Sequence, residues 1–397
     1  MEIKDKIISI YKRYSPSVRE AREQSNQLRH SMFMDRLKLP VGIFSDARIL
    51  EFGPGAGETS IYYARWGGMI EFVEINPDSC KMLRDKFHNE SLSNHIIEIH
   101  NSDFEFFSPQ SQREYDFVCA EGCLYLVDNP EDAFGNLVKK LKLGGFVMVA
   151  IPETLGSFQK ILKALLLHNL SGGNEERIVV LAKELFKEDL ERAHKAGGRP
   201  IHNIIYDEYI MPKLTTVPAD EVLRWFHDNN IRYYSSMPNL ETMPLYDSEY
   251  QSWIDLAESS ARSLVGASKL FHAKAKEYDK ERIEAKQKDL LELNKYLKEI
   301  ESVISDINLN DVDVVDLPKA QRCIKKMATL NYESIFSPER DVATTFSKFI
   351  NETLILIALL NNLGNFEAIS EAVNSFEILF RGFSGRSAQY YVGYRVL

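Results

Sequence analysis

The sequence EFGPGAG at residues 51–57 decides how this chain is interpreted, because it joins a short apolar run to a helix-like stretch. Its glycines, Gly53, Gly55 and Gly57, stand at alternate positions and let the backbone turn tightly and approach a ligand closely. A nicotinamide fingerprint would need a glycine where Glu58 stands, and no Gly-Lys-Ser/Thr follows, so dinucleotide and Walker loops are excluded. The carboxylates of Glu51 and Glu58 suit a ligand with a cationic end and neutral hydroxyls.

Short apolar runs alternate with amphipathic stretches on both sides of this loop. The predicted strands are 47–52, 69–75, 95–103, 115–122 and 146–153, and the predicted helices between them are 59–67, 77–89 and 130–142. Strands separated by helices of this length form βαβ units of a parallel sheet, and such sheets bind ligands at the carboxyl ends of their strands.

Acidic residues stand at the ends of three of these strands. Glu74 follows Glu51 by 23 residues, where a carboxylate can accept hydrogen bonds from both hydroxyls of a ribose. Asp103 ends the next unit, where it can accept an adenine amino group while the adjacent Phe104 covers the ring. Glu121 ends the fourth strand. These side chains should meet at one edge of the sheet.

In these residues the chain resembles the class I S-adenosylmethionine-dependent methyltransferases. The matching stretches are EFGPGAG (51–57), VEINPD (73–78), NSDFEFF (101–107), residues 117–145 and VMVAIPE (147–153), in the order and at the spacing of that family. The resemblance implies that S-adenosylmethionine is the cofactor. It places the three glycines, with Glu51 at the loop's edge, along the methionine part, Glu74 at the ribose, Asp103 and Phe104 at the adenine, and Glu121 near the methionine end.

A weaker resemblance covers residues 202–238, which look like methyltransferases of polysaccharide and small-metabolite pathways. In those proteins a final strand similar to YYVGYRV soon follows the sixth. Here residues 239–387 intervene, so we expect a helical insertion before residues 388–397 return antiparallel to the sheet. The expected fold is therefore α/β, a Rossmann-like sheet of seven strands. Its parts are an N-terminal helical cap (1–44), a cofactor-binding domain (45–238, with substrate-side helices and a loop at 154–218), the helical insertion (239–387) and the last strand (388–397).

The charged helical region contains a short heptad pattern. Leu290, Leu297 and Ile304 repeat every seven residues, as do Leu293, Ile300 and Ile307. Packing of helices within the chain is the preferred interpretation of this seam, and a homodimer through the helical region is the alternative.

Candidate residues for catalysis lie in segments expected to overhang the strand ends. Methyl transfer to a hydroxyl requires a positioned acceptor and a group that removes a proton. We expect His202 or Asp207 to be the base, and Tyr125, Tyr206 and Tyr209 to contact the substrate. No cluster with metal-ligand spacing stands out, and no metal is needed.

The predicted function is methyl transfer to a hydroxyl or amine of a small metabolite or sugar-like acceptor. The alternatives are a catalytically silent fold whose helical part binds a protein or forms a dimer, and a protein methyltransferase. A net charge of −10 argues against a nucleic-acid partner. A charged N-terminus without a signal-peptide pattern, no sufficiently long apolar run and only four cysteines lead us to expect a cytoplasmic protein without a membrane partner.

Overall fold

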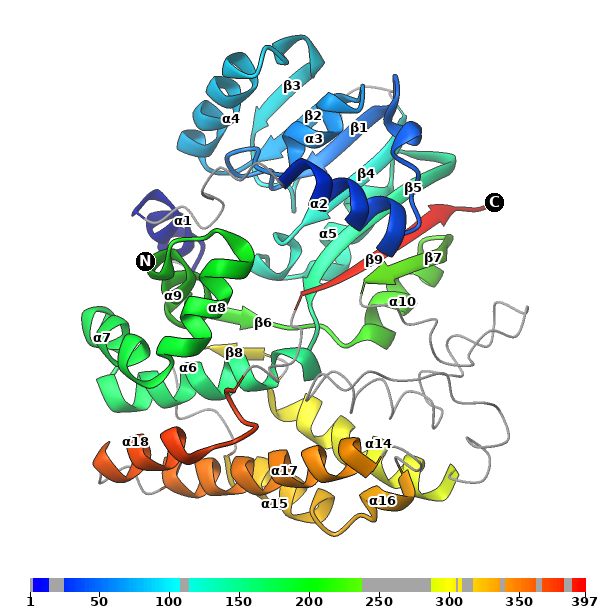
Figure 1. Ribbon diagram of the computed structural model, residues 1–397. Coiled ribbons are helices and arrows are strands. Elements are labelled where there is room, and N and C mark those ends of the chain that lie inside the picture. The colour runs from blue at the N-terminus through cyan, green and yellow to red at the C-terminus, as the bar shows by residue number, and fades with distance from the viewer. Residues whose placement is uncertain are drawn as a thin grey trace.

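The computed structural model describes residues 3–13, 25–107, 114–237, 287–304, 306–308, 317–335, 340–361, 366–381 and 388–397. Figure 1 shows a twisted sheet with helices against it, and a second, helical part beside the end of that sheet where β6 and β8 lie.

The sheet has seven strands in the order β3-β2-β1-β4-β5-β9-β7. They are β1 (Arg48–Phe52), β2 (Met69–Glu74), β3 (Ile96–Asn101), β4 (Tyr115–Glu121), β5 (Leu141–Pro152), β7 (Ile231–Met237) and β9 (Ala388–Arg395). β1 to β5 pair in parallel, whereas β9 runs antiparallel between β5 and β7. The last strand therefore returns to the sheet, which confirms the predicted fold.

Each face of the sheet carries an apolar core, as expected of strands that are buried on both sides. Helices α3 (Ser60–Arg65) and α4 (Pro77–Asn89), with the turns η1 (Met32–Arg36) and η2 (Val41–Phe44), contribute to one core. Helices α5 (Pro130–Val138) and α10 (Ala219–Asp228) contribute to the other, where the rings of Phe134 and Phe226 stack 5.3 Å apart. This packing fixes the strand ends that carry the predicted site.

A third core joins helices from distant parts of the chain. They are α6 (Phe158–Ser171), α7 (Glu175–Leu185), α8 (Lys187–Gly197), α9 (Ile201–Ile205), α14 (Gln287–Ile304), α15 (Leu317–Met327), α16 (Tyr332–Ile335), α17 (Arg340–Leu360) and α18 (Phe366–Ser375). The short strands β6 (Lys213–Thr215) and β8 (Asp306–Asn308) pair antiparallel and link its two halves. Leu293, Leu297, Ile300 and Ile304 are buried in this core, so packing within the chain is confirmed for these residues of the heptad seam.

Some predicted boundaries were wrong. The helix predicted at 130–142 ends at Val138, because Leu141 already pairs with Tyr115 in the sheet. Residues 197–218, at the end of the segment expected to hold substrate-side helices and a loop, contain α9, a π-helical turn η6 (Tyr206–Ile210) and β6. Residues 239–286 of the predicted helical insertion lie outside the described residues.

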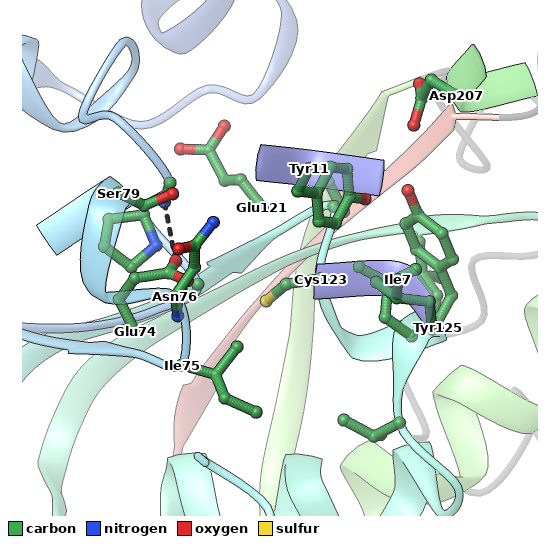
Figure 2. A pocket seen from close by; sticks show the side chains of 18 of the residues that line it. Ile7, Tyr11, Glu74, Ile75, Asn76, Ser79, Glu121, Cys123, Tyr125 and Asp207 are labelled. Atoms are coloured by element: carbon green, nitrogen blue, oxygen red, sulfur yellow. Dashed lines mark hydrogen bonds between the residues drawn. The ribbon is translucent and has the colours of Figure 1, made fainter. Parts of the chain in front are cut away.

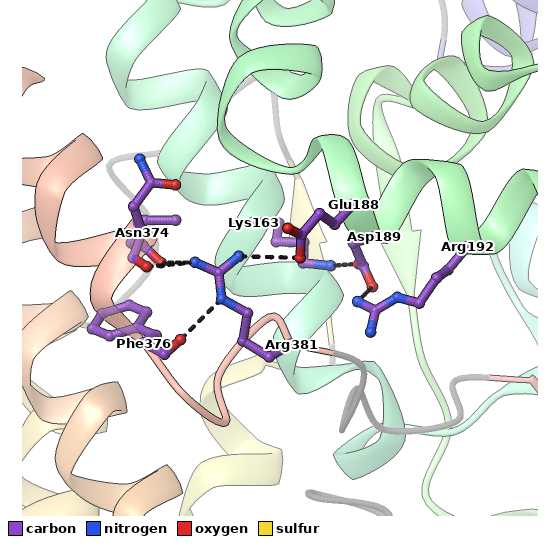
Figure 3. Close-up of polar contacts among 8 residues, drawn as sticks. Lys163, Glu188, Asp189, Arg192, Asn374, Phe376 and Arg381 are labelled. Carbon is purple, nitrogen blue, oxygen red and sulfur yellow. Dashed lines mark hydrogen bonds and ion pairs between the residues drawn. The ribbon is translucent and has the colours of Figure 1, made fainter.

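A partly buried ion pair joins α6 and α8, and the segment after α18 packs against it (Figure 3). Lys163 of α6 pairs with Asp189 of α8, and its ammonium group lies 5.3 Å from the ring centres of both Phe186 and Phe380. Arg381 donates hydrogen bonds to the carbonyls of residues 373, 374 and 376. The contact of Phe380 with Lys163, and that of Arg381 Nη1 with Glu188 Oε2 at 3.9 Å, hold the segment 376–381 against α6 and α8.

One helix in the described part of the chain is long and apolar enough to cross a membrane, judged by length and composition alone. It is α17, over Ala343–Leu360, and 44% of that window is buried. Phe346, Phe349 and Ile357 of this window lie in the helical core. A core helix of a globular protein passes the same test.

Candidate active site

A cavity of about 450 Å³ opens at the carboxyl ends of β1, β2 and β4. This volume is within the range of small-molecule sites. In Figure 2, Glu74, Asn76 and Ser79 lie at one end of the cavity, and Tyr11, Tyr125 and Asp207 lie at the other, with Cys123 between them. The cavity therefore has two chemically different ends.

Glu74 ends β2 and lines the cavity although it is only 7% exposed. Its Oε2 accepts a hydrogen bond from the backbone N–H of Gly55 at 3.0 Å, and its Oε1 accepts one from Asn76 at 2.8 Å. Burial raises the pKa of this carboxyl, although these backbone donors act in the opposite direction. Each oxygen keeps a lone pair for a ligand, so the carboxylate is oriented for two neighbouring hydroxyls.

The glycine loop reaches the cavity with only some of its residues. Gly53 and Gly55 line it, and both have positive φ angles, 62° and 57°, which favour glycine. Gly57 does not line the cavity, so the structure does not place it along the cofactor as expected. A Cβ on Gly57 would lie 2.4 Å from Cδ1 of Leu83, so this glycine allows α4 to pack closely.

Asp103 and Phe104 both line the cavity after β3. Asp103 Oδ1 accepts a hydrogen bond from the N–H of Glu105 at 3.0 Å, which orients the carboxylate. The Phe104 ring stacks on Phe52 with 5.2 Å between centres. The structure thus brings an oriented carboxylate and a fixed aromatic ring to the place expected for adenine.

Glu121 lines the cavity at the end of β4 and is held by two side chains from behind. Arg29 of helix α2 (Ser25–Ser31) donates hydrogen bonds to both of its oxygens, with 2.9 Å between Nη1 and Oε2. The Tyr63 hydroxyl donates to Oε1 at 2.5 Å. Sequence reasoning missed Arg29 and Tyr63, because no local spacing links Arg29 to a carboxylate 92 residues away.

Glu51 lies beneath the cavity rather than in its wall. It is 1% exposed, is absent from the lining, and its Oε2 has no hydrogen-bond partner. Burial and the negative charge of Glu121 raise its pKa to about 8. The expected direct contact between Glu51 and the cofactor is therefore not what the structure shows, because the side chain points into the packing between β1 and α3.

Glu51→Gln should change how stability depends on pH. Between the ordinary carboxyl value of 4.5 and about 8, the folded protein keeps a proton on Glu51 that the unfolded chain has lost. The wild-type protein therefore loses stability as pH rises through this window, by up to about 1.4 kcal/mol per pH unit, whereas the glutamine variant does not. Urea unfolding of both proteins at several pH values measures the difference, with the exposed Glu176→Gln as control. A constant difference across the window would contradict the assignment.

The far end of the cavity carries a polar group around Asp207. Its Oδ2 accepts a hydrogen bond from Arg199 Nη2 at 2.7 Å, and among the described residues this is its one hydrogen bond. Tyr11, on helix α1 (Ile3–Arg13), and Tyr125 are joined by a hydrogen bond. Burial raises the pKa values of both tyrosines, and the negative charge of Asp207 raises them further. Burial alone would lower the pKa of Arg199, but the carboxylates of Asp207 and Glu208 raise it.

Three other predicted residues lie elsewhere. His202 is absent from the cavity lining, and its ring contacts Tyr206 with 4.9 Å between centres. Burial lowers the pKa of His202, and the positive charge of Lys183 lowers it further. Tyr206 and Tyr209 are buried in the helical core instead of facing the substrate. Their placement follows from the α9–η6 turn, which points both rings inward.

The sequence pointed to no metal site, yet β2 and β3 bring Glu71, Glu98 and His100 within 4.8 Å of one another. The contacts within this group account for it without an ion. Glu71 is buried, and its oxygens already contact His100 Nε2 at 2.9 Å and the Tyr115 hydroxyl at 3.0 Å.

Comparisons with known proteins identify one family model and several similar solved structures. A family model described as a methyltransferase domain matches residues 22–198. One similar solved structure is the N-methyltransferase NodS from Bradyrhizobium japonicum, at 17% identity and a TM-score of 0.27, with 33% of this chain and 62% of that chain covered. A second is the CcbJ methyltransferase from Streptomyces caelestis, at 19% identity and a TM-score of 0.30, with 38% of this chain and 57% of that chain covered. A third is PKMT2 from Rickettsia typhi, at 13% identity and a TM-score of 0.43, with 54% of this chain and 46% of that chain covered. The chain thus spans 46–62% of the length of these proteins, and no curated protein sequence matches it.

The family match covers the part of the chain that builds β1 to β5 and the cofactor end of the cavity. Residues 22–198 thus form a methyltransferase domain, similar to the class I S-adenosylmethionine-dependent methyltransferases.

Proposed function

We propose that this protein transfers a methyl group from S-adenosylmethionine to a hydroxyl or amine of a small metabolite. The observation that carries the proposal is one cavity with two ends: an oriented carboxylate, Glu74, at the first and a second carboxylate, Asp207, at the other. A cofactor bound at the first end would extend its reactive group toward the second.

The cofactor end has the donor and acceptor groups that S-adenosylmethionine requires. Glu74 offers lone pairs for the two ribose hydroxyls, and Asp103 with Phe104 offers an acceptor and an aromatic surface for adenine. Gly53 and Gly55 allow backbone close to the ligand. These groups are fixed by backbone hydrogen bonds and ring stacking before any ligand arrives, which lowers the cost of binding.

When bound, S-adenosylmethionine supplies a methyl group on a positively charged sulfur, already activated toward a nucleophile. The chain's own residues must then position the acceptor, exclude water and remove a proton. Asp207 can accept that proton at Oδ1 while Arg199 holds Oδ2. Tyr11 and Tyr125 stay protonated, so they serve as hydrogen-bond donors and as walls.

The size of the cavity supports a small acceptor. Ile7, Ile8 and Tyr11 of helix α1 line it from one side, and Leu126 and Val127 add further apolar surface. An acceptor with an apolar part and a hydroxyl or amine near Asp207 fits this lining. We also infer a cytoplasmic location, because all four cysteines are free and buried, as is usual in a reducing compartment.

Glu74→Ala should weaken binding of S-adenosylmethionine and S-adenosylhomocysteine by about 1.5–3 kcal/mol, because two hydrogen bonds to a charged acceptor are lost. Calorimetric titration of the purified protein with both ligands measures this. Glu58→Ala is the matched control, since Glu58 also lines the cavity but pairs with Lys86 at 2.6 Å.

The outcomes separate the competing functions. Binding to the wild-type protein that is lost in the Glu74 variant alone supports the donor site. Failure of the wild-type protein to bind either ligand at millimolar concentration would reject methyl transfer and favour a catalytically silent scaffold.

A further inference from the structure

A buried charged cluster lies directly behind the cavity wall, at the ends of β1 and β4. It consists of Arg29, Glu51, Tyr63 and Glu121, and of these only Glu121 reaches the cavity. Arg29 is 8% exposed and comes from α2, outside the sheet, whereas the others belong to β1, α3 and β4. The N-terminal helix therefore contributes a charge to the interior of the methyltransferase domain.

The orientation of Glu121 depends on this cluster. Both carboxylate oxygens accept hydrogen bonds from the guanidinium fork of Arg29, and Oε1 also accepts one from Tyr63. A two-bond contact between arginine and a carboxylate fixes the plane of the carboxylate as well as its position. The guanidinium is itself fixed, because it lies 4.8 Å from the centre of the Phe33 ring and donates to the Tyr63 hydroxyl at 3.0 Å.

The cluster leaves one carboxylate oxygen able to meet a ligand. Burial and the charge of Glu121 raise the pKa of Glu51 to about 8, so near neutral pH the guanidinium of Arg29 faces one carboxylate, that of Glu121. Glu121 Oε1 accepts hydrogen bonds from both Arg29 and Tyr63, whereas Oε2 accepts one, from Arg29, among the described residues. Oε2 therefore keeps a lone pair at the cavity wall, and the ammonium group of an amino acid is a donor of suitable size.

We propose that Arg29 is a positioning residue for the amino-acid end of the cofactor: it holds Glu121 so that this carboxylate receives the ammonium group. The inference rests on the proposed function, since it assumes that S-adenosylmethionine or its product occupies the cavity. It assigns to the N-terminal helix α2 a part in cofactor selection.

The test compares two ligands that differ at one end. S-adenosylhomocysteine carries the amino-acid group, whereas 5′-methylthioadenosine has the same adenosine but lacks that group. In calorimetric titrations, Arg29→Gln should weaken S-adenosylhomocysteine binding by about 10- to 100-fold and change 5′-methylthioadenosine binding by less than about twofold. Arg29→Lys should recover part of the loss, because it keeps the charge but not the fork.

Two further variants protect the test against misfolding. Arg29→Gln leaves Glu121 buried without its partner, so the double variant Arg29→Gln/Glu121→Gln removes both charges and should show the same ligand selectivity. Tyr63→Phe removes one hydrogen bond to Glu121 and should give a smaller, equally selective loss. Arg65→Gln, on an exposed pair with Glu90, is the control and should affect neither ligand.

Each other outcome overturns the inference. Equal losses for both ligands would mean that Arg29 supports the whole domain and not the amino-acid end. Unchanged S-adenosylhomocysteine affinity in Arg29→Gln would remove the residue from the site while leaving the proposed function intact. No binding of either ligand to the wild-type protein would reject the proposed function and this inference together.

Discussion

Asp207→Asn is expected to lower turnover by about 10²- to 10⁴-fold while the affinity for S-adenosylhomocysteine changes little. Asparagine keeps the shape of the side chain and can still contact Arg199, but it cannot accept the proton that the acceptor loses. Asp207 lies at the end of the cavity away from Glu74, so the substitution should leave the affinity for the cofactor unchanged. The measurement is kcat with an acceptor found by screening hydroxyl- and amine-bearing metabolites with methyl-labelled S-adenosylmethionine.

The neighbouring carboxylate provides a matched control for this prediction. Glu208 lines the same cavity, yet it has no ion pair with Arg199 among the described contacts. Glu208→Gln should retain most of the activity. If Glu208→Gln is inactive and Asp207→Asn is active, the base is Glu208; if neither variant is impaired, the acceptor loses its proton directly to water.

Sequence reasoning was most successful where function follows from local position. Glu74, Asp103 and Glu121 were expected to meet because each ends a strand of one parallel sheet, and the structure places all three in the cavity wall. The period of apolar residues predicts strands, and parallel strands bring their carboxyl ends to the same edge. The prediction therefore required no knowledge of contacts between distant residues.

The substrate end could not be predicted in the same way. Tyr206 and Asp207 are adjacent in sequence, yet one is buried in the helical core and the other lines the cavity. Which side chain faces inward depends on the π-helical turn η6, whose wider spacing departs from the regular helical period. Tyr11 and Arg29 come from helices whose sequences show only an amphipathic pattern, and their partners are far along the chain.

The helical part of the molecule shows the same limit. Its apolar periodicity predicts helices, but not that residues 376–381 return to contact α6 and α8. The N–H of Phe380 donates to Gln159 Oε1 at 3.1 Å, across 221 residues. The N–H groups of residues 377–379 all donate to the Glu352 carboxylate of α17. The contacts that close this core are thus made by polar side chains, which a hydrophobic pattern does not reveal.

Lys163→Ala is expected to lower the free energy of unfolding by about 3 kcal/mol, because it breaks an ion pair whose lysine is buried. Lys163 is 3% exposed, and its ammonium group contacts Asp189 and two aromatic rings, Phe186 and Phe380. Urea unfolding followed by circular dichroism measures the loss. Lys160→Ala is the control, because Lys160 lies on the same helix, is half-buried and forms no ion pair among the residues described.

The size of this loss should depend on what remains around Asp189. Its Oδ1 still accepts a hydrogen bond from Arg192 at 2.8 Å, so the carboxylate keeps one cation at the surface and the loss should fall near the lower limit for a broken buried pair. Replacing both partners, as in Lys163→Met/Asp189→Leu, removes the uncompensated charge and should recover most of the lost stability. If the double variant is as unstable as Lys163→Ala, the aromatic contacts of the lysine, and not its ion pair, hold segment 376–381 in place.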